Sequence, residues 1–307
     1  LSPRYDAADS SNVGKKSILF DPSNSGKLIF VYNTNKIYAR VISFSGSAGS
    51  ESFSRSSAFT VSNYSYSSNS GTKMVPMGST GRYVIPIENS NTAYLRIITA
   101  SSSAITSRDS AGGSDAISLS TTVNYPPQIA IDPTDSTKGM MCAVNSSEDL
   151  VVRALTFSGS GTSATVSVGA ETQLTPGILS GGGYRYSGGW QQIVACGAGK
   201  YVAFAKGGDS PHNNKIVGVA FDYDGSYTLG SATYAPQNIT TDEPGPFWVA
   251  SNNFYSANNT ISLVGSYGSG STRNPNHPVY ATVCTRSDDR TISYTDVTAV
   301  GNTTNNK

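Results

Sequence analysis

The sequence is poor in charged residues, and the charges that it has nearly cancel. Asp, Glu, Lys and Arg make up 13% of the chain and the formal net charge is +1, whereas soluble proteins average about 25% charged residues. A near-zero charge argues against a nucleic-acid partner, because such proteins hold phosphates through Lys and Arg. Ser, Thr, Asn and Gly replace the charges, as is common in extracellular and virion β-proteins, so we expect a virion-exterior or extracellular location.

Long apolar runs are also missing. No run approaches the roughly 18–20 residues of a membrane-spanning helix, so we expect no membrane span. The chain opens Leu1-Ser2-Pro3-Arg4, without a Met or a signal peptide. Such a start is typical of a processed product or of a piece of a longer protein, and the sequence leaves these alternatives open.

The sequence has only three cysteines, Cys142, Cys196 and Cys284. They fall at non-equivalent positions of the repeats described below, and no CxxC or Cys/His spacing occurs. We therefore expect no zinc site and no other metal or cofactor. Buried free thiols are the expected state, with one disulfide as the alternative.

Three short apolar runs separated by polar turns recur five times along the chain. In the first repeat they span 18–22, 27–32 and 37–44. Each run is rich in β-branched and aromatic residues and too short for a helix, so each is predicted to be a strand. The first runs recur at intervals of roughly 55–65 residues, starting at Ile18, Met74, Ile129, Ile193 and Val249.

A fourth, weaker strand fits after each third run. These strands are expected around 53–61, 116–119, 164–168, 227–233 and 291–297. Four antiparallel strands per unit of about 40–60 residues are the signature of a propeller blade. The pattern thus predicts an all-β fold, a five-bladed β-propeller of four-stranded antiparallel blades.

A closed repeat array is one domain, which we predict over 18–301. Its blades are expected at about 18–70, 71–125, 126–188, 189–246 and 247–301. Residues 1–17 are predicted to be an N-terminal linker or closing segment, and 302–307 a polar tail.

An arginine recurs in the third run of the first three repeats, as Arg40, Arg96 and Arg153. Equivalent positions predict one shared environment for these side chains. Because a lone buried charge is costly, we expect each guanidinium to bind backbone carbonyls or an acid of a neighbouring blade.

The connections between antiparallel strands alternate between two faces of a blade. On one face they are short turns, such as 21–26 and 197–199. On the other they lengthen in the later blades, at 175–189, 207–214 and 265–278, and they carry Tyr, Trp, Arg and His.

We call the second face the aromatic loop face and predict that it binds a ligand or partner. Its predicted ligand-binding residues are Tyr66, Tyr125, Tyr184, Tyr186, Trp190, His212, Trp248, Tyr267, Arg273 and His277. The alternative is that the two tryptophans, which lie where a first strand begins, and the tyrosines of these loops as a set cap the hydrophobic core between blades.

Five-bladed propellers include glycoside hydrolases, which use two or three carboxylates in an axial pocket. The first strands offer only Asp21 and Asp132, each beside a turn proline, and no GxSxG, HExxH or P-loop motif occurs. We therefore expect no enzyme, with a glycoside hydrolase as the weaker alternative. Turn formation by these Asp-Pro pairs is expected over calcium binding by Asp132 and Asp135.

The first and third repeats share a hydrophobic-Asp-Pro…Gly-Lys pattern, in Asp21-Pro22…Gly26-Lys27 and Asp132-Pro133…Lys138. The likeness extends to the polar turns Phe44-Ser45-Gly46-Ser47 and Phe157-Ser158-Gly159-Ser160. The pattern resembles the repeats of bacteriophage virion proteins, in particular marine cyanophage tail-fibre-like and surface proteins. The resemblance implies a propeller on the virion exterior and supplies no catalytic residues.

Two non-catalytic functions fit these observations. In the first, the aromatic loop face binds a host-surface glycan or receptor protein, because flat rings stack on sugar faces at little entropic cost. In the second, the chain is an architectural subunit that packs against other virion or filament subunits. The sequence does not decide between a glycan and a protein ligand, and it does not give the oligomeric state.

Overall fold

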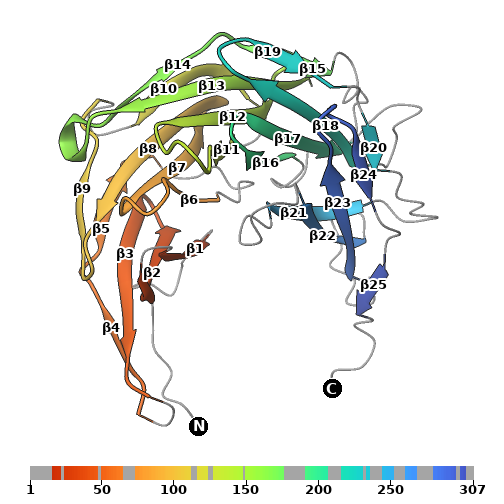
Figure 1. Ribbon diagram of the computed structural model, residues 1–307. Coiled ribbons are helices and arrows are strands. Elements are labelled where there is room, and N and C mark those ends of the chain that lie inside the picture. Colours follow the sequence, from red (N-terminus) through yellow and green to blue (C-terminus); the bar gives the residue numbers. More distant parts are fainter. Residues whose placement is uncertain are drawn as a thin grey trace. The chain divides into compact units, whose positions relative to one another are not determined.

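The protein is described by a computed structural model, which is almost entirely β-structure (Figure 1). It describes residues 16–21, 24–47, 50–64, 73–111, 116–123, 127–147, 149–175, 191–206, 216–230, 233–235, 244–251, 260–267, 279–294 and 298–301. Within these ranges there are 25 strands and one short 3-10 helix, η1 (Gly161–Ser163). None of the described residues belongs to a helix long and apolar enough to cross a membrane.

The strands form five antiparallel sheets, one for each predicted repeat. The first contains β1 (Lys16–Asp21), β2 (Asn24–Asn33), β3 (Ile37–Ser45), β4 (Ser52–Arg55) and β5 (Phe59–Ser62). The second contains β6 (Val75–Pro76), β7 (Arg82–Asn89), β8 (Thr92–Ala100), β9 (Ile105–Arg108) and β10 (Ile117–Thr122). The third contains β11 (Gln128–Ile131), β12 (Lys138–Val144), β13 (Leu150–Ser158), β14 (Thr165–Val168) and β15 (Thr172–Thr175).

The last two sheets repeat the same plan. The fourth contains β16 (Gln191–Gly197), β17 (Lys200–Lys206), β18 (Ile216–Tyr223), β19 (Tyr227–Leu229) and β20 (Thr233–Ala235). The fifth contains β21 (Pro244–Ser251), β22 (Thr260–Tyr267), β23 (Val279–Arg286), β24 (Ile292–Tyr294) and β25 (Thr298–Gly301). The predicted all-β repeat of five sheets is confirmed.

In every sheet two short segments take the place of the predicted fourth strand, and both pair with the third strand. In the second and third sheets the predicted ranges match only β10 and β14, so β9 and β15 were missed. In the first sheet, β4 pairs with the second half of β3 and β5 with its first half. Between them Ser56 still donates its N–H to the Val41 carbonyl. Asp109, Gly169 and Gly230 do the same at the equivalent breaks of the next three sheets.

The repeated arginines bind these breaks. The Nη1 atoms of Arg40, Arg96 and Arg153 donate to the carbonyl oxygens of the break residues Ser56, Asp109 and Gly169, at 2.5, 3.1 and 3.0 Å. This confirms the predicted shared environment. At each break the ladder of backbone hydrogen bonds is interrupted, and the arginine donates to the carbonyl oxygen of the break residue. This hydrogen bond gives both the guanidinium group and the backbone acceptor a partner.

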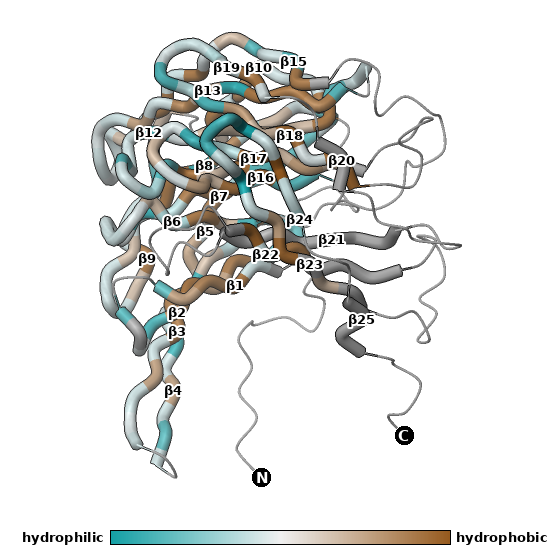
Figure 2. The backbone as a smooth tube through the Cα atoms, turned by 45° about the vertical axis from the view of Figure 1, so that its right-hand side comes forward, coloured by the Kyte–Doolittle hydropathy of each residue, from teal (hydrophilic) through white to brown (hydrophobic). Residues whose placement is uncertain are grey.

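The chain divides into two compact units: 1–131, 136–139 and 155–168 form the first, and 132–135, 140–154 and 169–307 the second. In each unit, consecutive sheets stack face to face. We call the face that a sheet turns to the next sheet its forward face, and the opposite one its backward face. Hydrophobic residues lie along the strands and hydrophilic residues gather at many of the turns (Figure 2).

The stacked faces form the hydrophobic cores. In the first unit, Ile29, Val31, Ile37, Ala39 and Val41 of the first sheet's forward face pack on Tyr83, Ile85, Ile87 and Ile98 of the second sheet's backward face. In the second unit, Val194, Val202, Phe204, Ile216 and Ala220 of the fourth sheet pack on Ile261, Leu263, Cys284 and Ile292 of the fifth. The same repeat positions meet in both cores, so one packing rule serves both units.

The three cysteines are buried free thiols. Burial raises the pKa of all three, to about 12 for Cys196 and about 11 for Cys284. The thiols are therefore protonated at neutral pH, and they act as small hydrophobic residues.

Candidate ligand-binding face

Most of the predicted ligand-binding residues fall outside the described residues. This applies to Tyr66, Tyr125, Tyr184, Tyr186, Trp190, His212, Arg273 and His277. Trp248 and Tyr267 are described through their backbones, as members of β21 and β22. Whether the ten residues form one site stays a prediction.

The strands that carry Trp248 and Tyr267 differ from the sequence prediction. Trp248 pairs with Val264 in the interior of β21. The strand begins four residues earlier, at Pro244, and its register shifts between Pro244 and Phe247. Tyr267 pairs with Pro244 and ends β22, and so does not lie in the following loop. The prediction placed both residues in loops because prolines and glycines near them mark turns. In the structure the strands run through these residues.

The described turns on this face are tight. Ser90 and Asn91 join β7 to β8 with φ values of 50° and 60°, the left-handed backbone of a two-residue hairpin. The buried Glu88 accepts the N–H of Asn91 at 3.0 Å. In the third sheet, Asn145 accepts the N–H groups of Ser147 and Asp149. These side chains stabilise their own turns.

Tyr64 acts as a core cap, the alternative role considered for the aromatic residues of this face. Its ring lies 5.0 Å from that of Tyr94, centroid to centroid, at an interplanar angle of 53°. Both half-buried rings pack against the core of the first unit. The Ser62 hydroxyl accepts the Tyr64 N–H and so fixes the start of the connection to the second sheet.

Sequence analysis missed two glutamines at the start of first strands. Gln128 begins β11 and Gln192 lies second in β16, and both are buried. Each precedes the first isoleucine of its repeat, and each follows within a few residues the aromatic Tyr125 or Trp190. An amide offers two donors and an acceptor, so each position places a buried hydrogen-bonding group at the start of a first strand. The repeated Gln-Ile pair was the available signal.

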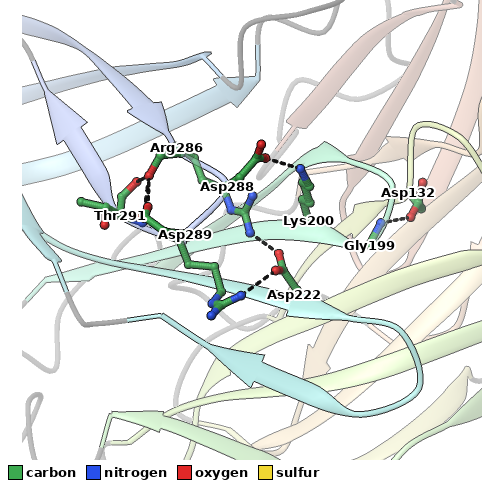
Figure 3. A network of polar contacts seen from close by, with 10 residues as sticks. Asp132, Gly199, Lys200, Asp222, Arg286, Asp288, Asp289 and Thr291 are labelled. Carbon is green, nitrogen blue, oxygen red and sulfur yellow. Dashed lines mark hydrogen bonds and ion pairs between the residues drawn. The ribbon is translucent and has the colours of Figure 1, made fainter.

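At the opposite edge, the carboxylates are engaged in turns and between sheets (Figure 3). The buried Asp132 accepts hydrogen bonds on both oxygens: Oδ1 from the N–H and hydroxyl of Thr134, and Oδ2 from the N–H of Gly199 at 2.7 Å. This is the turn role expected for the Asp-Pro pair, extended to the next sheet. Because protein donors occupy both oxygens, the site fits a turn better than a calcium ion.

Other carboxylates of the second unit form ion pairs. Asp222 binds Arg286 through Oδ1 and Arg290 through Oδ2, the latter at 3.1 Å. Lys200 binds Asp288 at 2.5 Å, and this hydrogen bond lowers the pKa of Asp288. Among the described residues no cluster of three or more His, Cys, Asp or Glu could hold a metal ion. These acids therefore pair with basic side chains between the fourth and fifth sheets.

No protein-family model matches the sequence, and neither does any curated protein. Among solved structures, the chain is similar to the lectin BP39L from Burkholderia pseudomallei, with a TM-score of 0.53 and 9% identity over 94% of this chain and 71% of that chain. It is also similar to an arginine-to-alanine triple mutant of AofleA from Arthrobotrys oligospora, with a TM-score of 0.50 and 7% identity over 92% and 78% of the two chains.

A GH32 β-fructofuranosidase from Bombyx mori, BmSUC1, matches with a TM-score of 0.45 and 12% identity over 93% of this chain and 62% of that chain. A likeness at that score supports no conclusion about activity. Together, the five repeated antiparallel sheets and the similarity to the first two structures establish the fold class. The protein is an all-β, five-bladed β-propeller.

Proposed function

We propose that the protein is a non-catalytic, lectin-like propeller that binds glycan through its aromatic loop face. The observation that carries the proposal is the fold shared with the BP39L lectin over 94% of this chain. The loops of the later repeats supply Tyr and Trp rings, which stack on the apolar faces of sugars at little entropic cost.

The described carboxylates support a non-catalytic role. Asp109 pairs with the buried Arg96, Glu171 with Arg153 and Asp222 with two arginines. A glycoside hydrolase needs instead two carboxyl groups that flank the scissile bond, about 5–10 Å apart. Carboxylates that already pair with arginines are not available as the acid and the base or nucleophile of a glycoside hydrolase.

The proposed ligand is a host-surface glycan, and the proposed location is the virion exterior or the extracellular space. Both rest on the Asp-Pro/Gly-Lys resemblance to phage virion repeats and on the low content of charged residues. A host receptor protein is the other partner that the aromatic loop face would suit.

A glycan array tests the proposal. Wild type is expected to bind a subset of glycans, and Tyr186→Ala, Trp190→Ala and Tyr267→Ala are expected to weaken binding by about tenfold or more each, the loss of one stacked ring. Leu229→Ala is the matched control, since its exposed side chain lies on β19, outside the aromatic loop face. Circular dichroism would show that each variant is folded.

Two results would overturn the proposal. If all three folded variants bind glycans as wild type does, the aromatic loop face is not the site. If a bound oligosaccharide is cleaved, with release of new reducing ends, the protein is a glycosidase.

A further inference from the structure

A lysine and an aspartate of the first sheet meet away from water. Lys27 of β2 forms an ion pair with Asp21 at the end of β1, and the two side chains are only 5% and 1% exposed. The Lys27 ammonium also donates to the carbonyl of Ser101 at 3.1 Å. All three residues belong to the first unit. Removal from water disfavours the charged forms of such a pair and so favours proton transfer from the ammonium to the carboxylate.

The pair lies against the hydrophobic core of the first unit. Ile29, which shares a face of β2 with Lys27, is a core residue, and so is Tyr83 of the second sheet. The Tyr83 side chain is buried beside Asp21: burial, and then the neighbouring carboxylate, raise the pKa of its hydroxyl. Tyr83 therefore keeps its proton and can donate it in a hydrogen bond to an oxygen of Asp21.

We propose that Lys27 and Asp21 condense to an amide, an isopeptide crosslink between β1 and β2. Proton transfer within the ion pair gives a neutral amine and a carboxylic acid. The Nζ lone pair of Lys27 then attacks Cγ of Asp21, and the Tyr83 hydroxyl stabilises the oxygen on which negative charge develops. The hydroxyl of the acid leaves with one proton from the nitrogen, as water. The amide keeps one N–H, which can still donate to the Ser101 carbonyl. No oxidant or cofactor is consumed.

The third repeat has the same Asp-Pro pair and a lysine at the equivalent position, but in a different setting. Asp132 accepts hydrogen bonds on both oxygens, from Thr134 and from the N–H of Gly199. These donors stabilise the carboxylate form. Lys138 is exposed at the start of β12, where water stabilises its ammonium. We therefore expect the crosslink in the first repeat and not in the third.

The crosslink would fasten an edge strand. β1 pairs only with β2 in its sheet, and the register between them shifts between Phe20 and Asp21. Strand ends with few ladder hydrogen bonds open most easily. A covalent bond from Asp21 to Lys27 closes the connection between the two strands, so that β1 keeps its register when the end of the ladder opens.

Mass spectrometry of the denatured protein tests the proposal. Wild type is expected to lack one water, about 18 Da, relative to its sequence. Trypsin cuts after a charged lysine, so the peptide 17–36 is expected to stay whole at Lys27. This peptide is expected to carry the entire deficit, and to give no separated fragments from backbone breaks between residues 21 and 27.

Lys27→Arg cannot form the amide and is expected to have the full mass of its own sequence. Lys138→Arg, the same change at the equivalent exposed position, is expected to keep the deficit. An aspartyl succinimide also lacks one water, but it cannot form at Asp21, because Pro22 has no N–H. A succinimide elsewhere would survive Lys27→Arg. If Lys27→Arg does not fold, the wild-type peptide decides alone. Folded wild type that has its full mass and is cut after Lys27, or a deficit that persists in Lys27→Arg, would overturn the proposal.

Discussion

The interface between the first and second sheets and that between the fourth and fifth use the same two positions with different chemistry. Lys27 of the first sheet forms an ion pair with the buried Asp21 and also donates to the carbonyl of Ser101, and Ser43 donates to the carbonyl of Ser102, these two hydrogen bonds at 3.1 Å each. The equivalents in the fourth sheet are Lys200 and Asp222. They meet charged side chains: Lys200 binds Asp288, and Asp222 binds two arginines.

This difference separates what the fold requires from what one interface adds. The fold requires apolar faces that stack, and both units have them in the same register. At the polar edge of the interface, each polar side chain needs only a hydrogen-bonding partner, which a backbone carbonyl or a charged side chain can provide. Carbonyl acceptors of the backbone are present in every variant, whereas a carboxylate is lost when its residue is replaced. We therefore expect the interface between the fourth and fifth sheets to depend more strongly on its individual side chains.

The largest expected effect comes from Asp222→Ala. This change leaves the buried Arg286 guanidinium without the carboxylate that it binds, and breaking a buried pair in this way costs about 3–5 kcal/mol. The free energy of unfolding in urea measures the loss. Ser43→Ala is the matched change in the first sheet and removes one hydrogen bond to a carbonyl, about 1 kcal/mol. Equal losses for the two variants would contradict the comparison.

The repeated arginines extend the comparison within one structural role. Arg96 and its partner Asp109 are both fully buried, whereas the side chains of Arg153 and Glu171 are 16% and 32% exposed. Arg96→Ala leaves a buried carboxylate and is expected to cost about 3 kcal/mol. Arg153→Ala is expected to cost about 1 kcal/mol, because water reaches its partner. Urea unfolding of both variants checks the order, and a reversed order would mean that burial does not set the strength of this motif.

How much the sequence predicts depends on whether a feature repeats. Arg40, Arg96 and Arg153 share one alignment position, and their common environment was predicted from it. The ion pair between Asp222 and Arg286 was not predictable in this way. Its partners are 64 residues apart, and the position of Arg286 is Phe44 in the first repeat. An alignment of repeats shows what blades have in common and cannot pair residues that differ between blades.

The divided outer strand was missed for a different reason. The break residues Ser56, Asp109, Gly169 and Gly230 have weak β propensity, but the surrounding sequence is polar and contains many such residues. Which of these polar residues becomes the break residue depends on how it pairs with the third strand, and the local sequence does not show that pairing. For the candidate site, loop length and aromatic content predicted a face, whereas the buried Gln128 and Gln192 are apparent only once the bounds of their strands are known.

The pH dependence of stability tests the pair that Lys200 and Asp288 form between the fourth and fifth sheets. The hydrogen bond from Lys200 lowers the pKa of Asp288 below the ordinary value of about 3.9. A carboxyl with a lower pKa in the folded state adds stability above its unfolded pKa, and this is lost as the pH falls through the folded value. Asp288→Asn is therefore expected to lose less stability than wild type as the pH falls from about 5 through the lowered pKa of the folded state. Urea midpoints across this range measure the difference, and parallel curves would contradict it.

The smallest expected effect is in thiol reactivity, which reports how often the interface between the fourth and fifth sheets opens. Cys196 and Cys284 lie on its two sides and belong to its core, and burial raises their pKa to about 12 and about 11. Native protein is expected to react very slowly with iodoacetamide, because little thiolate forms and the reagent must wait for opening. Asp222→Ala is expected to speed the alkylation of these two cysteines. Cys142 of β12 is the internal control, since it lies outside this core. If the alkylation rates of all three cysteines rise by the same factor, the substitution loosens the whole second unit and not this interface alone.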